Sequence, residues 1–505
     1  MECLKYFILT AVLSQTLAQH CLSRDYGYGS VVCVCNAEHC DSIEPITRIE
    51  KSSYVVYTSN KAGLRFDKKT IKFDDGQTQD QNKITVGGTV YQEVLGFGGA
   101  FTDSAGINIL SLNSTVQEKL LDSYFSDRGI EYNLCRVPVG GTDFSTRRYS
   151  YHDDAEDASL GSFNLQDEDY KYKIPIVKRA AALNKDLELF ASSWTAPKWM
   201  KVVDFPAGPF GYLKEIYYQT WAEYHVKFLD AYAKDNITFW GMTTGNEPFS
   251  GLLPILVPSV GWTADRQRLW IAEHFGPAIR NSSHSKIKLI ALDDQRCFLP
   301  GYVKTLFENE AVEKYIDGIA IHWYADKIFN SDRLRQTHEA FPKKFLLGSE
   351  ASLGALPVII QHVKLGSWDR AESYAFDIID DVNHYVGGWV DWNMALNLQG
   401  GPTYIANYLD APIIVNATAG EFYKQPYFYV IGHFSKFVPR GSLRIETTHT
   451  DKDLIVTAFR RPDNGTAIVI LNRTDKIKHV TLTTGDGRNI STQLTKRSLS
   501  TFLYW

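Results

Sequence analysis

The sequence predicts a (β/α)8 barrel with a β-sandwich built from both ends of the chain. The chain of 505 residues is longer than one ordinary domain of about 100–200 residues. Its middle part repeats an apolar run followed by an amphipathic stretch, which is the pattern of alternating strands and helices. Its two ends instead carry short runs in which polar and apolar residues alternate.

Eight apolar runs in the middle of the chain are typical of buried strands. They lie at 94–100, 133–139, 187–194, 237–244, 287–292, 318–324, 344–349 and 387–393. Helix-like segments lie between them, for example 216–232 and 371–385. Eight such alternations fit a closed parallel barrel. A doubly wound open sheet is the alternative, but residues 96–99 lack the spacing of a phosphate-binding glycine turn.

The chain ends predict a second layer of structure. Residues 50–91 and 442–505 contain short alternating runs divided by Gly, Asp and Asn, which indicates antiparallel strands. Because each half is small, we expect both to pair into one β-sandwich beside the barrel.

The amino terminus predicts a secretory protein. Residues 1–18 combine Lys5, a short apolar run and small residues before a cleavage site, as a signal peptide does. The run is too short to span a bilayer, which takes about 20 residues. Four cysteines then follow within twenty residues, and they predict two disulfides: Cys21, Cys33, Cys35 and Cys40. A zinc site is the alternative, and the secretory route disfavours it.

Seven N-x-S/T sequons predict glycosylation of at least some asparagines. They are Asn113, Asn236, Asn281, Asn416, Asn464, Asn472 and Asn489.

The charge balance excludes a nucleic-acid binder. The chain has 53 basic and 58 acidic residues, for a formal charge of −5. Protonation of all 13 histidines would turn that charge into +8. We therefore expect the sign of the charge to reverse in an acidic compartment.

Two glutamates stand at the ends of predicted strands. Glu247 follows the fourth run and Glu350 the seventh, so the two should face each other across the barrel mouth, where barrel enzymes hold their catalytic residues. A retaining glycosidase needs two carboxylates about 5–5.5 Å apart. A single Glu after a strand is more commonly a helix cap or a solvated loop residue.

Other residues at the strand ends favour a sugar site. Sugars present apolar faces and a rim of hydroxyls, so their sites combine aromatic rings with carboxylates and amides. Residues of these kinds are Asp143, Trp194, Asn246, His322, Tyr324 and Trp392. Core packing is the alternative for each aromatic ring.

Other chemistries find no support. Asp293 and Asp294 have no His or Glu at ligand spacing, so we expect a loop or cap pair rather than a metal site. Neither G-x-S-x-G nor H-E-x-x-H occurs. We expect no metal and no organic cofactor.

The chain resembles glycoside hydrolase family 30 over nearly all of its mature length. The matching stretches include SVVCVCNAEHCDS at 30–42, GFGGAFTDSA at 96–105, RVPVGGTDFS at 136–145, TTGNEP at 243–248, LDDQR at 292–296, IAIHWY at 319–324, GSE at 348–350, KLGSWDR at 364–370, GWVDWNMALN at 388–397 and YKQPYFYVIGHFSKFVP at 423–439. A match of this length exceeds what a shared barrel architecture explains.

The resemblance implies roles for individual residues. Glu247 corresponds to the general acid/base, Glu350 to the nucleophile, and Arg136 to an arginine that supports the carboxylates. Positions that would hold the glucosyl unit or line its pocket are Asp143, Trp194, Asn246, His322, Tyr324, Trp392 and Asn407. The implied disulfides are Cys21–Cys33 and Cys35–Cys40.

The resemblance also implies a domain plan. A small disulfide-bearing β domain would comprise 19–45 and 394–425. The β-sandwich would comprise 46–91 and 442–505, and the barrel 92–393 and 426–441.

The implied activity is the hydrolysis of glucosylceramide to glucose and ceramide by a retaining β-glucosidase. The implied location is the lysosome lumen, and the implied partner is a saposin-type activator. We expect protonated histidines to draw the protein to an anionic phospholipid surface at low pH. We expect the charge of Glu350 to raise the pKa of Glu247, and Arg136 to lower that of Glu350.

Two further functions stay open at this point. One is a secreted exo-β-glycosidase acting on other β-glucosides or oligosaccharides. Departures from the family at Gly245 and in the loop 249–262, which has no Tyr, leave the aglycone preference open, whereas Ser352 in place of a Cys should be harmless to catalysis. The other is a silent carbohydrate-binding protein, which the retention of both carboxylates disfavours.

Overall fold

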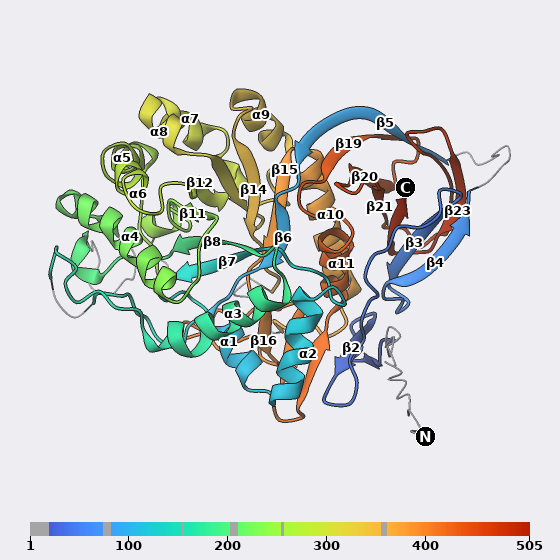
Figure 1. Cartoon of the computed structure of the whole chain (residues 1–505), viewed down its shortest axis with the longest axis horizontal. Helices are drawn as coiled ribbons and strands as arrows, with labels where there is room; N and C mark the ends of the chain where they lie inside the picture. Colours follow the sequence, from blue (N-terminus) through green and yellow to red (C-terminus); the bar gives the residue numbers. More distant parts are fainter. Residues whose placement is uncertain (1–19, 74–81, 154–155, 203–210, 254–256, 355–360) are drawn as a thin grey trace, which may run out of the picture.

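A computed structural model describes residues 20–73, 82–153, 156–202, 211–253, 257–354 and 361–505. The signal peptide predicted at 1–18 lies outside these residues. Figure 1 shows a barrel surrounded by helices, with a β-sandwich to its right and the small sheet that contains β2 and β16 below. Among the described helices, none is both long enough and apolar enough to cross a membrane.

The eight predicted barrel strands are confirmed. They are β6 (Gly96–Gly99), β7 (Leu134–Val139), β8 (Glu188–Ser193), β11 (Gly241–Thr243), β12 (Lys288–Gln295), β13 (Gly318–His322), β14 (Phe345–Glu350) and β15 (Val386–Asp391). Neighbours in this sheet are parallel. A parallel bridge between Ala100 and Arg136 joins β6 to β7 and closes the barrel.

The barrel interior changes from apolar to polar along the strands. One apolar layer holds Leu134, Phe190, Ile290, Ala320, Leu347 and Val390. Side chains two residues apart on a strand share a face. The next inward layer is therefore polar on four of these strands, with Arg136, Ser192, His322 and Ser349. The apolar layer packs the barrel interior, and the polar layer forms the floor of its mouth.

Helices cover the outside of the barrel. They are α1 (Asp103–Leu110), α2 (Ser114–Phe125), α3 (Ile174–Leu183), α4 (Tyr218–Lys234), α5 (Ala264–Trp270), α6 (Gly276–Arg280), α7 (Gly301–Phe307), α8 (Glu310–Tyr315), α9 (Asp332–Ala340), α10 (Trp368–Asn383) and α11 (Pro426–Ser435). The helices predicted at 216–232 and 371–385 correspond to α4 and α10. All residues of α11 are buried because it lies between the barrel and the sandwich, as Figure 1 shows.

The two chain ends form one nine-stranded sheet, as predicted. Its strands are β3 (Ser53–Asn60), β4 (Asp67–Lys72), β5 (Asn82–Glu93), β19 (Leu443–His449), β20 (Leu454–Arg460), β21 (Thr466–Asn472), β22 (Lys478–Thr483), β23 (Asn489–Leu494) and β24 (Ser498–Tyr504). Strands near both edges contribute to one apolar core, for example through Tyr54 and Ile490. The sheet therefore folds over on itself as a sandwich.

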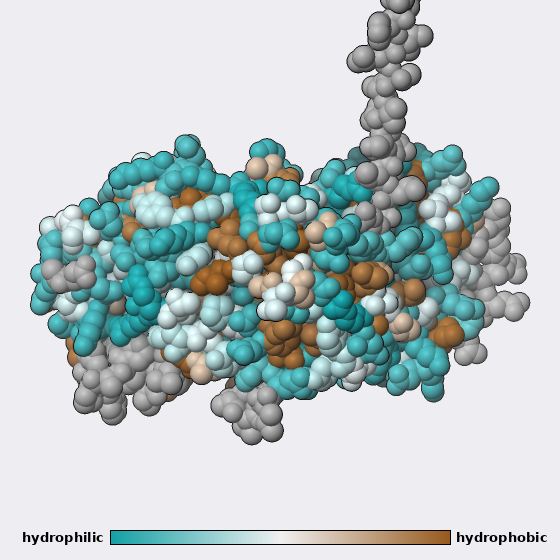
Figure 2. Space-filling model, turned by 90° about the horizontal axis from the view of Figure 1, so that it is seen from below, coloured by the Kyte–Doolittle hydropathy of each residue, from teal (hydrophilic) through white to brown (hydrophobic). Residues whose placement is uncertain are grey.

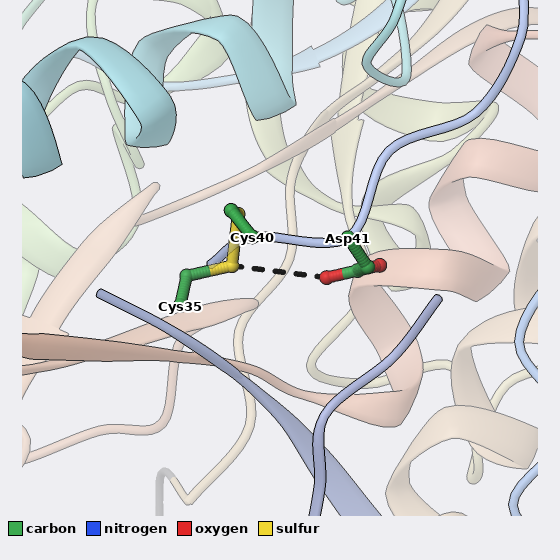
Figure 3. A group of neighbouring side chains, drawn as sticks. All are labelled: Cys35, Cys40 and Asp41. Carbon is green, nitrogen blue, oxygen red and sulfur yellow. Dashed lines mark hydrogen bonds between the residues drawn. A yellow bond between two sulfur atoms is a disulfide. The ribbon is translucent and has the colours of Figure 1, made fainter. Parts of the chain in front are cut away.

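A third sheet joins the amino end to the segment after the barrel. It contains β1 (Ser23–Asp25), β2 (Val31–Cys35), β16 (Ala395–Asn397), β17 (Ile413–Asn416) and β18 (Glu421–Lys424). Both predicted disulfides, Cys21–Cys33 and Cys35–Cys40, are present. Figure 3 shows the second one, beside the carboxylate of Asp41. A separate two-stranded ribbon pairs β9 (Lys201–Val202) with β10 (Tyr212–Leu213).

The sequons differ in exposure. Six of the asparagines are exposed or partly exposed. Asn472 is instead fully buried, and its Nδ2 atom donates to the carbonyls of Lys476 and Thr495 at 2.9 and 2.8 Å. A glycan at Asn472 is incompatible with this burial, so the other six sequons stay the predicted sites.

Between α10 and the loop after β13, three carboxylates share one arginine. Oxygens of Asp326, Asp377 and Asp381 lie within 4.8 Å of one another. Arg296 pairs with Asp326 at 2.9 Å and with Asp381 at 3.3 Å. Burial raises the pKa of Asp326 to about 9 and that of Asp377 to about 6. Burial also holds the pKa of Asp381 well above its ordinary value.

This cluster stabilises the fold more at pH 5 than at pH 7.5. In the unfolded chain these carboxyls release their protons near pH 4, whereas in the folded chain they keep them to higher pH, up to about 9 for Asp326. Their contribution to the free energy of unfolding therefore falls as the pH rises from about 4 toward 9. We expect the cluster to account for a decrease of at least about 1 kcal/mol between pH 5 and pH 7.5, measured by denaturant titration as the difference between the wild type and Asp326→Asn. Asp326→Asn, which mimics the protonated carboxyl, should flatten this dependence, and Asp475→Asn at an exposed position should not. Equal pH dependence in all three proteins would contradict the prediction.

Candidate active site

The barrel mouth contains a cavity of about 150 Å³. Eight of the ten predicted site residues line it, and the other two, Arg136 and His322, are buried beside it. The full lining is Asp143, Trp194, Asn246, Glu247, Val257, Tyr324, Glu350, Trp392, Asn407 and Leu409. The structure thus brings together every predicted residue of the sugar site.

Glu247 is held by donors on both carboxylate oxygens. It follows β11 with a positive φ of 42°, and its N–H donates to the carbonyl of Asp293 at 2.9 Å. His322 Nδ1 lies 3.0 Å from its Oε1, and Gln295 Nε2 donates to the same oxygen at 3.1 Å. Ser250 Oγ donates to Oε2 at 2.7 Å. A positive φ is strained for a residue other than glycine, and these hydrogen bonds hold Glu247 in that conformation.

Glu350 ends β14 and faces a different set of partners. Its Oε2 forms a close ion pair with Arg136, and its Oε1 accepts a hydrogen bond from the Tyr324 hydroxyl at 2.9 Å. His322 Nδ1 lies 4.0 Å from the same Oε1.

The two glutamates are close enough for double displacement. Oxygens of Glu247 and Glu350 lie within 4.8 Å of each other, with His322 between them. Inverting glycosidases separate their carboxyl groups by about 6.5–9.5 Å to admit a water molecule, and retaining enzymes by about 5–5.5 Å. The spacing here corresponds to the retaining geometry.

Asp293 connects the parts of this site, and sequence reasoning missed it. Its side chain is fully buried and accepts from Arg136 Nη2, Ser192 Oγ and Ser349 Oγ, each at 2.6 Å. His322 Nε2 lies 3.1 Å from Oδ1, the oxygen that accepts from Ser349. The expected loop or cap pair at Asp293 and Asp294 is therefore wrong, because both residues lie within β12 and are buried.

A register shift in β12 explains the error. Strict alternation from the inward Ile290 would place Leu292 inside the barrel and turn Asp293 outward. The pairing with β13 instead shifts between Leu292 and Asp294, and both Leu292 and Asp293 have positive φ values of 71° and 56°. This bulge turns Asp293 into the polar layer. The signals in the sequence were the Asp-Asp pair after an apolar run and its place in the matching stretch at 292–296.

The pKa values of the pair differ from the expectation. Burial alone would raise the pKa of Glu247, but the hydrogen bond and charge of His322, with the Ser250 hydroxyl, lower it below its ordinary value. Burial raises the pKa of Glu350, and the charges of His322 and Arg136 offset only part of this effect. The expectation neglected His322, which lies closer to Glu247 than to Glu350.

His322 is a fixed cation in this site. Burial alone would lower its pKa, but the charges of Glu350 and Asp293 and the hydrogen bond with Glu247 raise it to about 10. A doubly protonated imidazole donates from both nitrogens, which matches its two contacts with Glu247 and Asp293.

Aromatic rings line one part of the pocket, and polar side chains line another part. The rings of Trp194 and Trp392 stack with centroids 4.7 Å apart, and the Arg136 guanidinium lies 4.6 Å from the Trp194 ring. Asn407 Nδ2 donates to Asp143 at 2.8 Å, and burial raises the pKa of Asp143 to about 7. A sugar ring meets an apolar face and hydroxyl-binding groups in this arrangement.

Three described groups have the residue types of a metal site. Each already has another role, since a disulfide joins the sulfurs of Cys35 and Cys40, as Figure 3 shows. Protonated His322 lies between Glu247 and Glu350, and Arg296 pairs with Asp326 and Asp381 of the aspartate cluster described above.

A barrel whose fourth and seventh strands present paired glutamates to a tryptophan-walled pocket defines the class of protein, a glycoside hydrolase. The models of the glycosyl hydrolase family 30 TIM-barrel domain and beta sandwich domain match residues 94–438 and 441–502. The chain belongs to glycoside hydrolase family 30.

Individual relatives match over most of their length. Lysosomal acid glucosylceramidase of Mus musculus is 42% identical, covering 99% of this chain and 98% of the relative. Putative glucosylceramidase 4 of Caenorhabditis elegans is 41% identical, covering 96% and 94%. The crystal structure of SrfJ from Salmonella typhimurium superposes with a TM-score of 0.83 at 26% identity, covering 90% of this chain and 99% of that one.

Proposed function

We propose that the chain is a retaining β-glucosidase that hydrolyses glucosylceramide to glucose and ceramide. The single observation that carries the proposal is the pair of carboxylates within 4.8 Å of each other in a pocket suited to one sugar ring. The names of the relatives in mouse and nematode support the choice of substrate.

In the first step Glu350 acts as the nucleophile. Its ionised carboxylate forms a bond to the anomeric carbon while the bond from that carbon to the ceramide oxygen breaks. Glu247 transfers its proton to the departing oxygen, so ceramide leaves as a neutral alcohol. Tyr324 and Arg136 hold Glu350 in place through its two oxygens.

In the second step Glu247 acts as a base. Its ionised carboxylate removes a proton from water, the water oxygen attacks the anomeric carbon, and the ester bond to Glu350 breaks. Two displacements at one carbon retain the β configuration. Glu247 is then protonated and Glu350 ionised, as at the start of the cycle.

Taken one at a time, the pKa directions of the two carboxyls favour a proton on Glu350 rather than on Glu247. The first step needs a proton on Glu247, whose pKa lies below its ordinary value because His322 and Ser250 donate to it. The one proton of the pair belongs to both carboxyls, and only the form with that proton on Glu247 is productive. Because burial raises the pKa of Glu350, the productive form is a fraction of the singly protonated pair, and turnover requires a pH at which the pair retains one proton.

We further propose that the protein works in the lysosome lumen, peripheral to an anionic membrane, and that a saposin-type activator presents the lipid. Apolar residues gather in the middle of the face shown in Figure 2, and this supports the proposal that the protein contacts a lipid surface. We also propose that the signal peptide at 1–18 is cleaved and that some of the sequons carry glycans.

Histidine contributes less to membrane attraction than its number suggests. Burial lowers the pKa of His225 to about 4 and that of His433 to about 3, so both stay neutral at pH 5. His322 is already charged at neutral pH. The expected change to +8 is therefore too large, and only the other histidines can contribute to it.

Turnover of glucosylceramide in vesicles tests the proposal. At pH 5 we expect glucose release that rises when the vesicles contain phosphatidylserine, because anionic lipid concentrates the enzyme at the surface. Proton NMR of the first-formed glucose should show the β anomer. β-Linked disaccharides and β-xylosides serve as comparison substrates. Faster release from the disaccharides than from glucosylceramide would favour the secreted exo-β-glycosidase instead.

A further inference from the structure

Ser250 contacts the acid/base candidate twice. It begins a short 3-10 helix, Ser250–Leu252, and its N–H donates to the carbonyl of Glu247 at 2.9 Å. Its hydroxyl donates to Glu247 Oε2 at 2.7 Å. Ser250 is partly buried, and no sequence motif pointed to it.

The surrounding turn is anchored independently of this hydroxyl. The N–H of Phe249 donates to Asp294 Oδ2 at 3.0 Å, and the Phe249 ring packs on Phe298 with centroids 4.9 Å apart. The N–H of Glu247 is bound by the carbonyl of Asp293. Removal of the Ser250 hydroxyl alone should therefore leave the turn in place.

The contacts also show which oxygen carries the catalytic proton. Oε1 of Glu247 already meets two donors, His322 Nδ1 and Gln295 Nε2. A proton on that oxygen would point at other N–H groups, so the proton must reside on Oε2. Oε2 is the oxygen that the Ser250 hydroxyl approaches.

We propose that Ser250 is a positioning residue for the acid/base step, whose hydroxyl holds the proton-carrying oxygen of Glu247 and sets the pH range of activity. The inference rests on the proposed function, because it assumes that Glu247 delivers the proton.

The effect of the hydroxyl has a definite sign. As a donor it stabilises the ionised carboxylate and so lowers the pKa of Glu247, as the donors around this group do together. When Glu247 is protonated, the hydroxyl oxygen also competes with the glycosidic oxygen for that proton. Both effects reduce the productive form above the acidic range.

Other charged or titratable groups face Glu247 and remain unchanged when Ser250 is replaced. They are Asp143, Asp293, Asp294, His322, Tyr324 and Glu350. His322 stays protonated to a pKa of about 10 and Asp293 stays ionised. Burial and the charge of Glu247 raise the pKa of Asp294 to about 8, so Asp294 stays mostly protonated in acid.

The experiment compares kcat/KM at pH 7 with kcat/KM at pH 5. On the alkaline side the rate is proportional to the fraction of Glu247 that is protonated. We expect Ser250→Ala to raise the ratio of the two values about three- to tenfold over wild type, as loss of one hydrogen bond of ordinary strength predicts. A purely structural loss would lower both values together and leave the ratio unchanged.

Three variants make the result specific. Ser250→Thr retains a hydroxyl and should restore the wild-type ratio. Ser126→Ala removes a comparable hydroxyl, which bonds the carbonyl of Asp122 at 2.9 Å outside the pocket, and should change nothing. Ser250→Gly removes the same hydroxyl without a methyl group and should match Ser250→Ala, which also covers the case of a misfolded alanine variant.

The outcomes distinguish a failure of the role of Ser250 from a failure of the proposed function. A ratio unchanged or lowered in both Ser250→Ala and Ser250→Gly overturns the role of Ser250. If Glu247→Gln then still loses most activity on glucosylceramide, the proposed function stands without it. If Glu247→Gln retains full activity, the assignment of Glu247 and the inference fail together.

Discussion

Replacement of Glu350 by glutamine should reduce turnover by about 10⁴-fold or more, because a neutral amide cannot form the ester with the anomeric carbon. The change keeps the shape of the side chain, so the pocket should remain folded. Release of nitrophenol from an aryl β-glucoside at pH 5 gives the rate. Mass spectrometry after reaction with a fluoro-sugar inactivator should show a glycosylated Glu350 in the wild type and no label in the variant.

Glu372→Gln is the matched control for this experiment. Glu372 is also a buried glutamate, but it lies on α10 and pairs with Arg473 and Arg497 at 3.1 and 2.8 Å, outside the pocket. Its replacement should leave the label on Glu350. Full turnover in Glu350→Gln, with the inactivator attached to another residue, would refute the assignment of the nucleophile.

Asp293→Ala should produce the largest loss of stability among single changes in the site. It leaves the buried cations of Arg136 and His322 without the carboxylate that both contact. Removal of one partner from a buried ion pair costs about 3–5 kcal/mol, and denaturant titration at pH 5 measures this loss. Activity should fall as well, since Arg136 positions Glu350.

Asp235→Ala provides the comparison for a solvent-exposed pair. Asp235 pairs with Lys178 at 2.7 Å at the surface, where removal of an ion pair costs less than about 1 kcal/mol. An unfolding free energy of Asp293→Ala equal to that of Asp235→Ala would show that the buried network contributes little.

The sequence alone was sufficient for the architecture. Barrel strands are buried on both faces, so they appear as continuous apolar runs, and all eight were found at their positions. The carboxyl ends of parallel strands meet at one face of a barrel. For that reason Glu247 and Glu350, far apart in the chain, were expected in one pocket.

The electrostatics of the pocket depended on tertiary contacts. The expectation treated Glu247 and Glu350 as an isolated pair, in which the nucleophile raises the pKa of the acid. In the folded protein His322 lies near both glutamates, and the charges of Glu350 and Asp293 keep it protonated. The distances from a cation to each carboxylate decide the two pKa values, and no sequence spacing encodes those distances.

The sequence by itself thus determined the barrel, the sandwich, the two disulfides and the two glutamates. Only the tertiary structure decided that Asp293 turns inward, that Asn472 is buried and that Ser250 reaches Oε2 of Glu247. The physical reason is that hydrophobic periodicity reports which face of a strand is buried. A bulge of one residue, the burial of a polar side chain in a sheet that is covered on both faces, and a single hydroxyl contact each leave that periodicity almost unchanged.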